Sequence, residues 1–123
     1  MKTELVFDRA FPGLNGKDGL IREHWAKRKK RFDTLMWEVL SQTSNRHEGQ
    51  VRITYKRVSP RLMDWFENLP ATGKLLMDAV VKCGVIKDDS PKIIPFSPKF
   101  EQEKGKAKTI LIIEDLADDD KTS

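Results

Sequence analysis

Apolar and polar positions along the chain follow two different periods, and these periods predict the secondary structure. In residues 50–58 the apolar side chains of Val51, Ile53 and Tyr55 alternate with polar ones, as in a half-buried strand. The segment at residues 92–102 is interrupted by prolines, which is typical of an irregular strand near a sheet edge. Four segments are predicted to be strands: residues 3–11, 50–58, 92–102 and 109–113.

Two segments show the spacing of amphipathic helices, residues 20–41 and residues 72–83. Gly84 follows the second helix and is well placed to end it in a left-handed conformation. A polar and aromatic loop is predicted before that helix, from Ser59 to Gly73, and a turn from Glu103 to Lys106. The predicted order is β-α-β-α-β-β, a small mixed β-sheet with two helices in the α+β class.

The length of 123 residues favours a single domain over residues 1–116, followed by an acidic tail, 117–123, that is predicted to be disordered. A chain this small has limited room for both a core and a large substrate site, so a homodimer is expected. No stretch approaches the roughly 20 apolar residues that span a membrane, and no signal peptide is recognised. The single cysteine, Cys83, fits a reducing compartment and a packing role, so we expect a cytoplasmic protein.

The net charge of +4 is unevenly distributed. Residues 114–123 sum to −4, so residues 1–113 carry +8. A basic body suggests a polyanionic partner, most often nucleic acid, although a solvated helix face remains an alternative for any basic run. The candidate phosphate-contacting residues are Lys27, Arg28, Lys29, Lys30, Arg31 and Arg61.

Carboxylates cluster at both ends of the second predicted helix. Asp64 and Glu67 precede it, and Asp88 and Asp89 follow it. Hard oxygen ligands of this kind suit Mg²⁺ or Mn²⁺, and Lys74 could stabilise charge in a transition state. The alternative is that these residues cap the helix or form an ordinary turn. The two histidines, His24 and His47, lack metal-ligand spacing and are interpreted as surface or structural residues.

This region resembles the RusA-type Holliday-junction resolvases, which carry a D-x-D-N-L motif, a lysine on the following helix and then a D-D pair. Three parts of the chain match in order: Asp64 with Glu67-Asn68-Leu69, then Lys74 to Ala79, then Cys83 to Ile86 with Asp88-Asp89. The specific match spans about thirty residues, and the predicted order of elements is similar over most of the chain.

The resemblance implies a homodimer that binds four-way or branched DNA and cleaves it symmetrically with Mg²⁺, and many family members are encoded by phages or prophages. It implies no small-molecule organic cofactor. By the same resemblance Asp64 is the first metal ligand, Lys74 the catalytic lysine and Asp89 the distal carboxylate, with Asp88 as a less essential metal-binding neighbour. Glu67 takes the place of the second motif aspartate, one residue further along than in the family pattern.

Two other classes of function remain open. A protein of this fold could bind DNA without cleaving it, as a phage accessory protein, if the longer spacing before Glu67 disrupts the metal site. A plain interaction domain would use the basic helix and acidic tail for solubility alone. If the endonuclease interpretation is right, Asp64, Glu67 and Asp89 converge, and the dimer interface uses apolar residues of the second helix or the strands.

Overall fold

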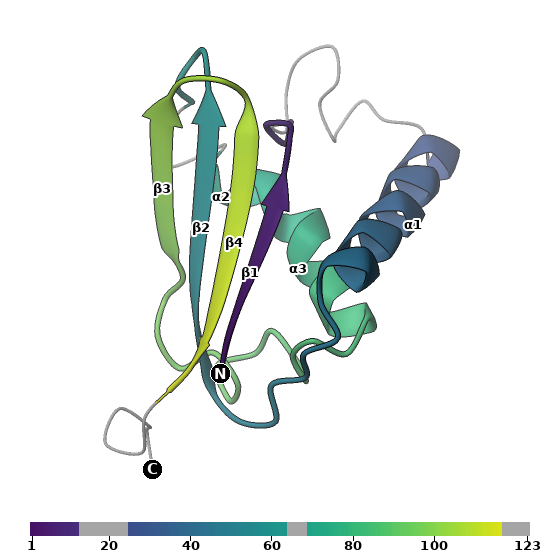
Figure 1. Ribbon diagram of the computed structural model, residues 1–123, viewed down its shortest axis with the longest axis vertical. Coiled ribbons are helices and arrows are strands. Elements are labelled where there is room, and N and C mark those ends of the chain that lie inside the picture. The colour runs from purple at the N-terminus through teal and green to yellow at the C-terminus, as the bar shows by residue number, and fades with distance from the viewer. Residues whose placement is uncertain (13–24, 64–68, 117–123) are drawn as a thin grey trace.

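The computed structural model describes residues 1–12, 25–63 and 69–116, and within them four strands form one mixed sheet. The strands are β1 (Lys2–Phe7), β2 (Val51–Ser59), β3 (Lys99–Lys104) and β4 (Lys108–Asp115). Their order in the sheet is β1-β4-β2-β3 (Figure 1). β4 runs antiparallel to both of its neighbours, whereas β3 pairs parallel with β2 and forms one edge of the sheet. The prediction of an edge strand in this part of the chain is confirmed.

The helices of the described residues are α1 (Trp25–Gln42), the single turn α2 (Leu69–Thr72), and α3 (Lys74–Lys82). α1 packs against α3, and both lie on the same side of the sheet (Figure 1). The predicted class, a small α+β protein with a mixed sheet and two main helices, is confirmed. None of the described helices is long and apolar enough to cross a membrane.

The core lies between the helices and one face of the sheet, which we call the inward face. Alternate strand residues point toward the helices because successive side chains of a strand leave opposite faces. Each fully buried aliphatic side chain here contributes roughly 1.5–3 kcal/mol relative to an exposed one. The buried inward residues and their helical partners include Leu5, Phe7, Ile53, Tyr55, Leu111, Ile113, Leu35, Val39, Leu76 and Val80.

β1 is shorter than predicted. It ends at Phe7 rather than continuing to residue 11, because the hydroxyl group of Thr109 bends the chain over the end of the sheet. That hydroxyl donates to the carbonyl of Arg9 at 2.7 Å and accepts a hydrogen bond from the amide of Phe11 at 3.3 Å.

The predicted strand at residues 92–102 was also wrong in extent, since β3 covers Lys99–Lys104. Pro95 and Pro98 have no amide hydrogen to donate to a ladder, so the segment before β3 is irregular. It is tied to the sheet elsewhere, through the amide of Val51, which donates to the carbonyl of Ile93 at 2.8 Å. The turn predicted from Glu103 begins only after Lys104.

The second predicted helix, residues 72–83, corresponds to α3, which begins only at Lys74. The preceding turn α2, which ends at Thr72, was not predicted, and Gly73 separates the two. Gly73 lies against the ring of Tyr55, and a Cβ atom added there would come within 3.0 Å of that ring. The Tyr55 hydroxyl group is also 2.6 Å from the hydroxyl oxygen of Thr72, so the break between the helices is fixed by β2. Gly84 has φ of +81°, which confirms the predicted left-handed end of α3.

His47 is a buried structural residue that ties three separate segments together. Its side chain is almost fully buried, at 1% exposure, with Nε2 2.7 Å from Thr3 Oγ1 and Nδ1 2.7 Å from Asp115 Oδ1. Partial burial would raise the pKa of the Asp115 carboxyl group, but its hydrogen bonds from His47 and from the amino terminus hold that pKa below its usual value. The network therefore joins β1, the segment after α1, and the end of β4.

Replacing His47 with Ala should lower the free energy of unfolding by roughly 1–3 kcal/mol, because Thr3 and Asp115 lose a buried partner. The matched control is Glu48→Ala, an exposed neighbour whose loss should change stability by less than about 0.5 kcal/mol. Urea denaturation of the two variants measures the difference. Equal stabilities would show that the His47 network contributes nothing to the fold.

Candidate functional site

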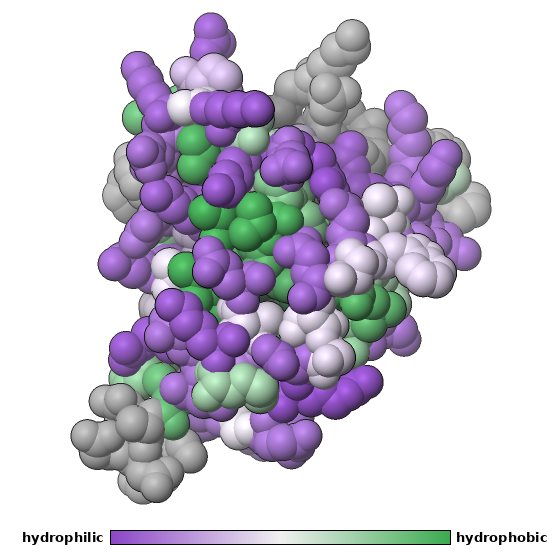
Figure 2. All heavy atoms as spheres, in the orientation of Figure 1, coloured by the Kyte–Doolittle hydropathy of each residue, from purple (hydrophilic) through white to green (hydrophobic). Residues whose placement is uncertain are grey.

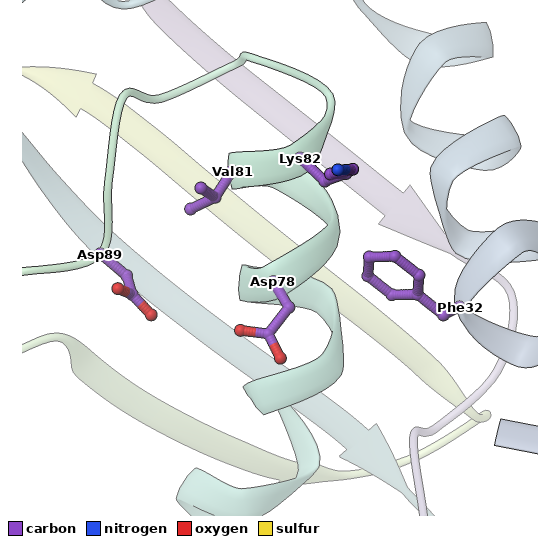
Figure 3. Close-up of a pocket in the computed structure, with 5 residues that line it drawn as sticks. All are labelled: Phe32, Asp78, Val81, Lys82 and Asp89. Atoms are coloured by element: carbon purple, nitrogen blue, oxygen red, sulfur yellow. The ribbon is translucent and has the colours of Figure 1, made fainter. Parts of the chain in front are cut away.

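The described residues form an open hollow of about 200 Å³ between α3, α1 and the turn that follows α3. The residues that line it are Phe32, Asp78, Val81, Lys82 and Asp89 (Figure 3). Figure 3 shows the carboxylates of Asp78 and Asp89 pointing toward the same space beside α3, with Phe32 reaching in from α1.

The sequence of α3 explains why charged groups line this hollow. Lys74, Asp78 and Lys82 are exposed and follow one another at helical spacing, so they form one stripe on α3. The opposite side of α3 buries Leu76 and Val80 against the sheet. Because Gly84 reverses the chain at the end of α3, the following turn returns along the helix and brings Asp89 to the stripe.

Asp88 and Asp89 have different surroundings although they are neighbours. The carboxylate of Asp88 accepts a hydrogen bond from the amide of Asp89 at 2.9 Å. A hydrogen bond from the side chain of Ser90, with that from the Asp89 amide, holds the pKa of the Asp88 carboxyl group below its usual value. Asp88 thus forms the turn, as the alternative interpretation of this segment expected, while Asp89 faces the hollow.

Asp64 and Glu67, the two carboxylates predicted to precede α3, lie outside the described residues. The residues on either side of them are firmly held. The side-chain amide of Gln102 accepts from the Met63 amide at 2.9 Å and donates to the Met63 carbonyl at 3.0 Å. Leu69 on the other side is fully buried. The predicted convergence of Asp64, Glu67 and Asp89 therefore stays a prediction.

Among the residues that the structure describes, no group of three or more metal-ligating side chains comes together. Two carboxylates, Asp78 and Asp89, do share the hollow. The sequence did not single out Asp78 as a site residue, although its position four residues after Lys74 places it on the same stripe. Lys74 is exposed at the first position of α3 but does not line the hollow.

The predicted basic surface begins at the edge of this hollow. Residues 27–30 are exposed on α1, Arg31 is partly buried, and the next residue, Phe32, lines the hollow itself. Arg61, the other predicted DNA contact, is exposed just after β2. The structure therefore brings Lys82, Asp78 and Asp89 together with Phe32, the residue that follows the basic run of α1.

Cys83 takes no part in this region as a nucleophile. Its thiol is half-buried, and its sulfur atom lies 3.6 Å from the carbonyl of Met36 on α1. Burial raises the pKa of the thiol, which disfavours the reactive thiolate form. Cys83 thus helps to join α3 to α1, in agreement with its predicted packing role.

No protein-family model and no curated protein matches this chain. The resemblance to RusA-type resolvases therefore stays a prediction, made from the motif residues and the order of elements.

The hydrogen bonds that the Asp88 carboxylate accepts predict that replacing Asp88 by Asn and by Ala has different effects on metal binding. Asp88→Asn should leave Mg²⁺ affinity within about threefold of wild type, because the asparagine oxygen still accepts the hydrogen bonds of the turn. Asp88→Ala removes that acceptor and should weaken metal binding by displacing Asp89. Calorimetric titration with Mg²⁺ or Mn²⁺ compares the variants. If Asp88→Asn loses as much affinity as Asp88→Ala, Asp88 acts as a ligand instead.

Proposed function

We propose that the protein is a magnesium-dependent endonuclease of the RusA type, which resolves four-way or branched DNA junctions by symmetric cleavage. The observation that carries the proposal is the shared position of Asp78, Asp89 and Lys82 around one hollow, whose wall on α1 is Phe32, the residue that follows the basic run. A carboxylate site beside a cationic surface is what metal-assisted phosphodiester cleavage requires.

In this proposal Asp64, Glu67 and Asp89 hold the ion, and Asp78 either joins them or orients a water molecule. Bound Mg²⁺ supplies neutralisation of phosphate charge and a water molecule of lowered pKa. Lys74 is held at the start of α3, where an ammonium group can meet charge that develops on the phosphate. Asp88 acts as a positioning residue, because its carboxylate holds the amide of Asp89.

A second candidate function is junction binding without cleavage. It is favoured by the finding that the described residues supply two carboxylates to the hollow and no third ligand. Cleavage that depends on a divalent ion separates the two functions.

Asp89→Asn is the direct test of catalysis. The substitution keeps the size of the side chain but removes a negative charge that binds metal. We expect cleavage of a synthetic four-way junction in Mg²⁺ to fall at least about 100-fold, while junction binding in EDTA persists or tightens. The control is Asp8→Asn, which replaces an exposed carboxylate that is distant in sequence from Asp89. This variant should cleave normally. Wild-type cleavage by Asp89→Asn would remove Asp89 from the mechanism, and cleavage by wild type in EDTA would rule out the metal.

The basic run of α1 is tested by charge reversal. Lys29→Glu with Lys30→Glu removes phosphate neutralisation, so junction binding should weaken and the slope of log affinity against log salt should become shallower by roughly one unit per lost contact. The control pair Lys92→Glu with Lys106→Glu makes the same charge change at exposed turn positions outside α1 and outside the strands. If both double variants bind junctions equally well, the cations of α1 are solvated surface residues that do not contact DNA.

The homodimer needs a surface, and the open face of the sheet offers one. Figure 2 shows an apolar patch over the strands, surrounded by hydrophilic residues. On this outward face Val6, Ile110 and Ile112 are only half-buried in the single chain, and they lie together across β1 and β4. A second copy of the chain would cover them.

The charges around this patch favour a second copy over nucleic acid. Cations and acids are nearly balanced there, and some already pair, as in Lys56 with Glu103 at 2.7 Å and Lys99 with Glu101 at 3.1 Å. A balanced rim is complementary to itself but gives no net attraction for a polyanion. DNA would then approach from the helical side, where α1 carries its cations.

Ile110→Glu should dissociate this dimer, because it buries a charge against the apolar patch of the partner. The matched control is Leu40→Glu, an exposed position on α1 that should leave the dimer intact. Light scattering coupled to size exclusion reports the mass of each, with circular dichroism to establish that both fold. A monomeric wild type would contradict the resolvase proposal, and dissociation by Leu40→Glu alone would move the interface to α1.

A further inference from the structure

The inward face of the sheet changes from apolar to polar at a single row of residues. Leu111, Tyr55 and Phe100 are paired across β4, β2 and β3 and belong to the core or pack against it. The next inward row along these strands consists of Thr109, Arg57 and Gln102, which are also paired in register. This row lies toward the end of β2, on the side of the sheet that carries the helices.

Arg57 is the unusual member of this row because its charged side chain is buried. Only 8% of the residue is exposed. Its Nε–H group donates to the carbonyl of Phe11 at 2.8 Å, and no carboxylate of residues 1–12, 25–63 or 69–116 forms an ion pair with it. Burial lowers the pKa of the guanidinium group, which still remains charged at neutral pH.

The two register partners of Arg57 in this row do not compensate its charge. The hydroxyl group of Thr109 is engaged by Arg9 and Phe11, and the amide of Gln102 is engaged by both backbone groups of Met63. These contacts are made by neutral groups. The single bond from Nε leaves the two terminal nitrogens of the guanidinium group without a partner among the described residues.

A buried cation without a counter-charge is strongly unfavourable, and an apolar side chain of similar length would fill the same position without that penalty. The guanidinium fork presents parallel N–H groups that match the oxygens of a phosphate. An anion such as a phosphate is therefore a well-matched partner for the terminal nitrogens of Arg57.

We propose that Arg57 is the anchor of a phosphate-binding site at the row Thr109, Arg57 and Gln102. The inference rests on the proposed function for the identity of the ligand, which is a phosphodiester group of the bound nucleic acid. Arg57 lies near the start of α3, because Tyr55, the inward residue before Arg57 on β2, contacts Thr72 and Gly73. A phosphate held by Arg57 is on the helical side of the sheet, as are the hollow and α1.

The test uses the full chain in EDTA, titrated with inorganic phosphate against sodium chloride of equal ionic strength. Side-chain Nε–Hε signals of the arginines are followed by nuclear magnetic resonance, together with the melting temperature. We expect the Arg57 signal to shift saturably with phosphate, and the melting temperature to rise with phosphate concentration as binding to the folded state requires.

Three variants make the assignment specific. Arg57→Gln should weaken phosphate binding at least tenfold, and Arg57→Lys should weaken it less, since a lysine keeps the charge but loses the fork. Arg52→Gln is the matched control, because Arg52 is an exposed arginine on the opposite face of the same strand and contacts the ring of Phe96. It should bind phosphate as the wild type does.

A wild-type Arg57 signal that does not move with phosphate overturns the proposal even if Arg57→Gln fails to fold. Equal phosphate affinity of wild type and Arg57→Lys also overturns the role of the fork. Saturable binding at Arg57 in a protein that cleaves no junction would leave this site standing and remove the nuclease proposal. Metal-dependent cleavage without any phosphate effect at Arg57 would leave the nuclease proposal standing and remove the phosphate site.

Discussion

The inward face of β4 is the constraint on which the rest of the structure depends. Thr109, Leu111 and Ile113 have no exposed surface. Because β4 pairs with β1 on one side and β2 on the other, the first and last strands meet, and the helices formed by the chain between them cover this face. The apolar core ends at Thr109, where the polar row that includes Arg57 begins. The hollow and the basic helix both follow from where β4 places α3 and α1.

Local periodicity was enough to predict most of the elements. Burial of one face imposes the alternation seen in β2 and β4 and the helical spacing of α1 and α3, so these could be read from the chain. The errors occur where distant contacts decide the backbone. The bend after Phe7 depends on Thr109, which bonds to Arg9 from 100 positions away, and the break at Gly73 depends on the ring of Tyr55. No local pattern encodes such contacts.

The candidate site was predictable to a similar degree. The paired acids after α3 drew attention to Asp89, but the sequence could not say that Asp88 would form the turn while Asp89 faces the hollow. Asp78 was missed as a site residue, and Arg57 was predicted only as one charge of a phosphate-contacting surface, because the significance of both depends on what packs beside them. Asp78 becomes a site residue because the chain returns after Gly84 and brings Asp89 beside it. Arg57 stands out because its register partners in the sheet are neutral.

The proposed functions assign the helical side of the molecule to nucleic acid and metal and the open sheet face to a second copy. The central proposal is that the hollow beside α3 binds a divalent ion through Asp89. Nuclear magnetic resonance of the wild type and of Asp89→Asn during titration with Mn²⁺ tests this most directly. We expect the amide signals of Asp78 and Asp89 to broaden first in the wild type, at less than one equivalent of Mn²⁺, and Asp89→Asn to lose this effect at residue 78. Broadening confined to the acidic residues at 114–120, with the α3 signals unchanged, would contradict it.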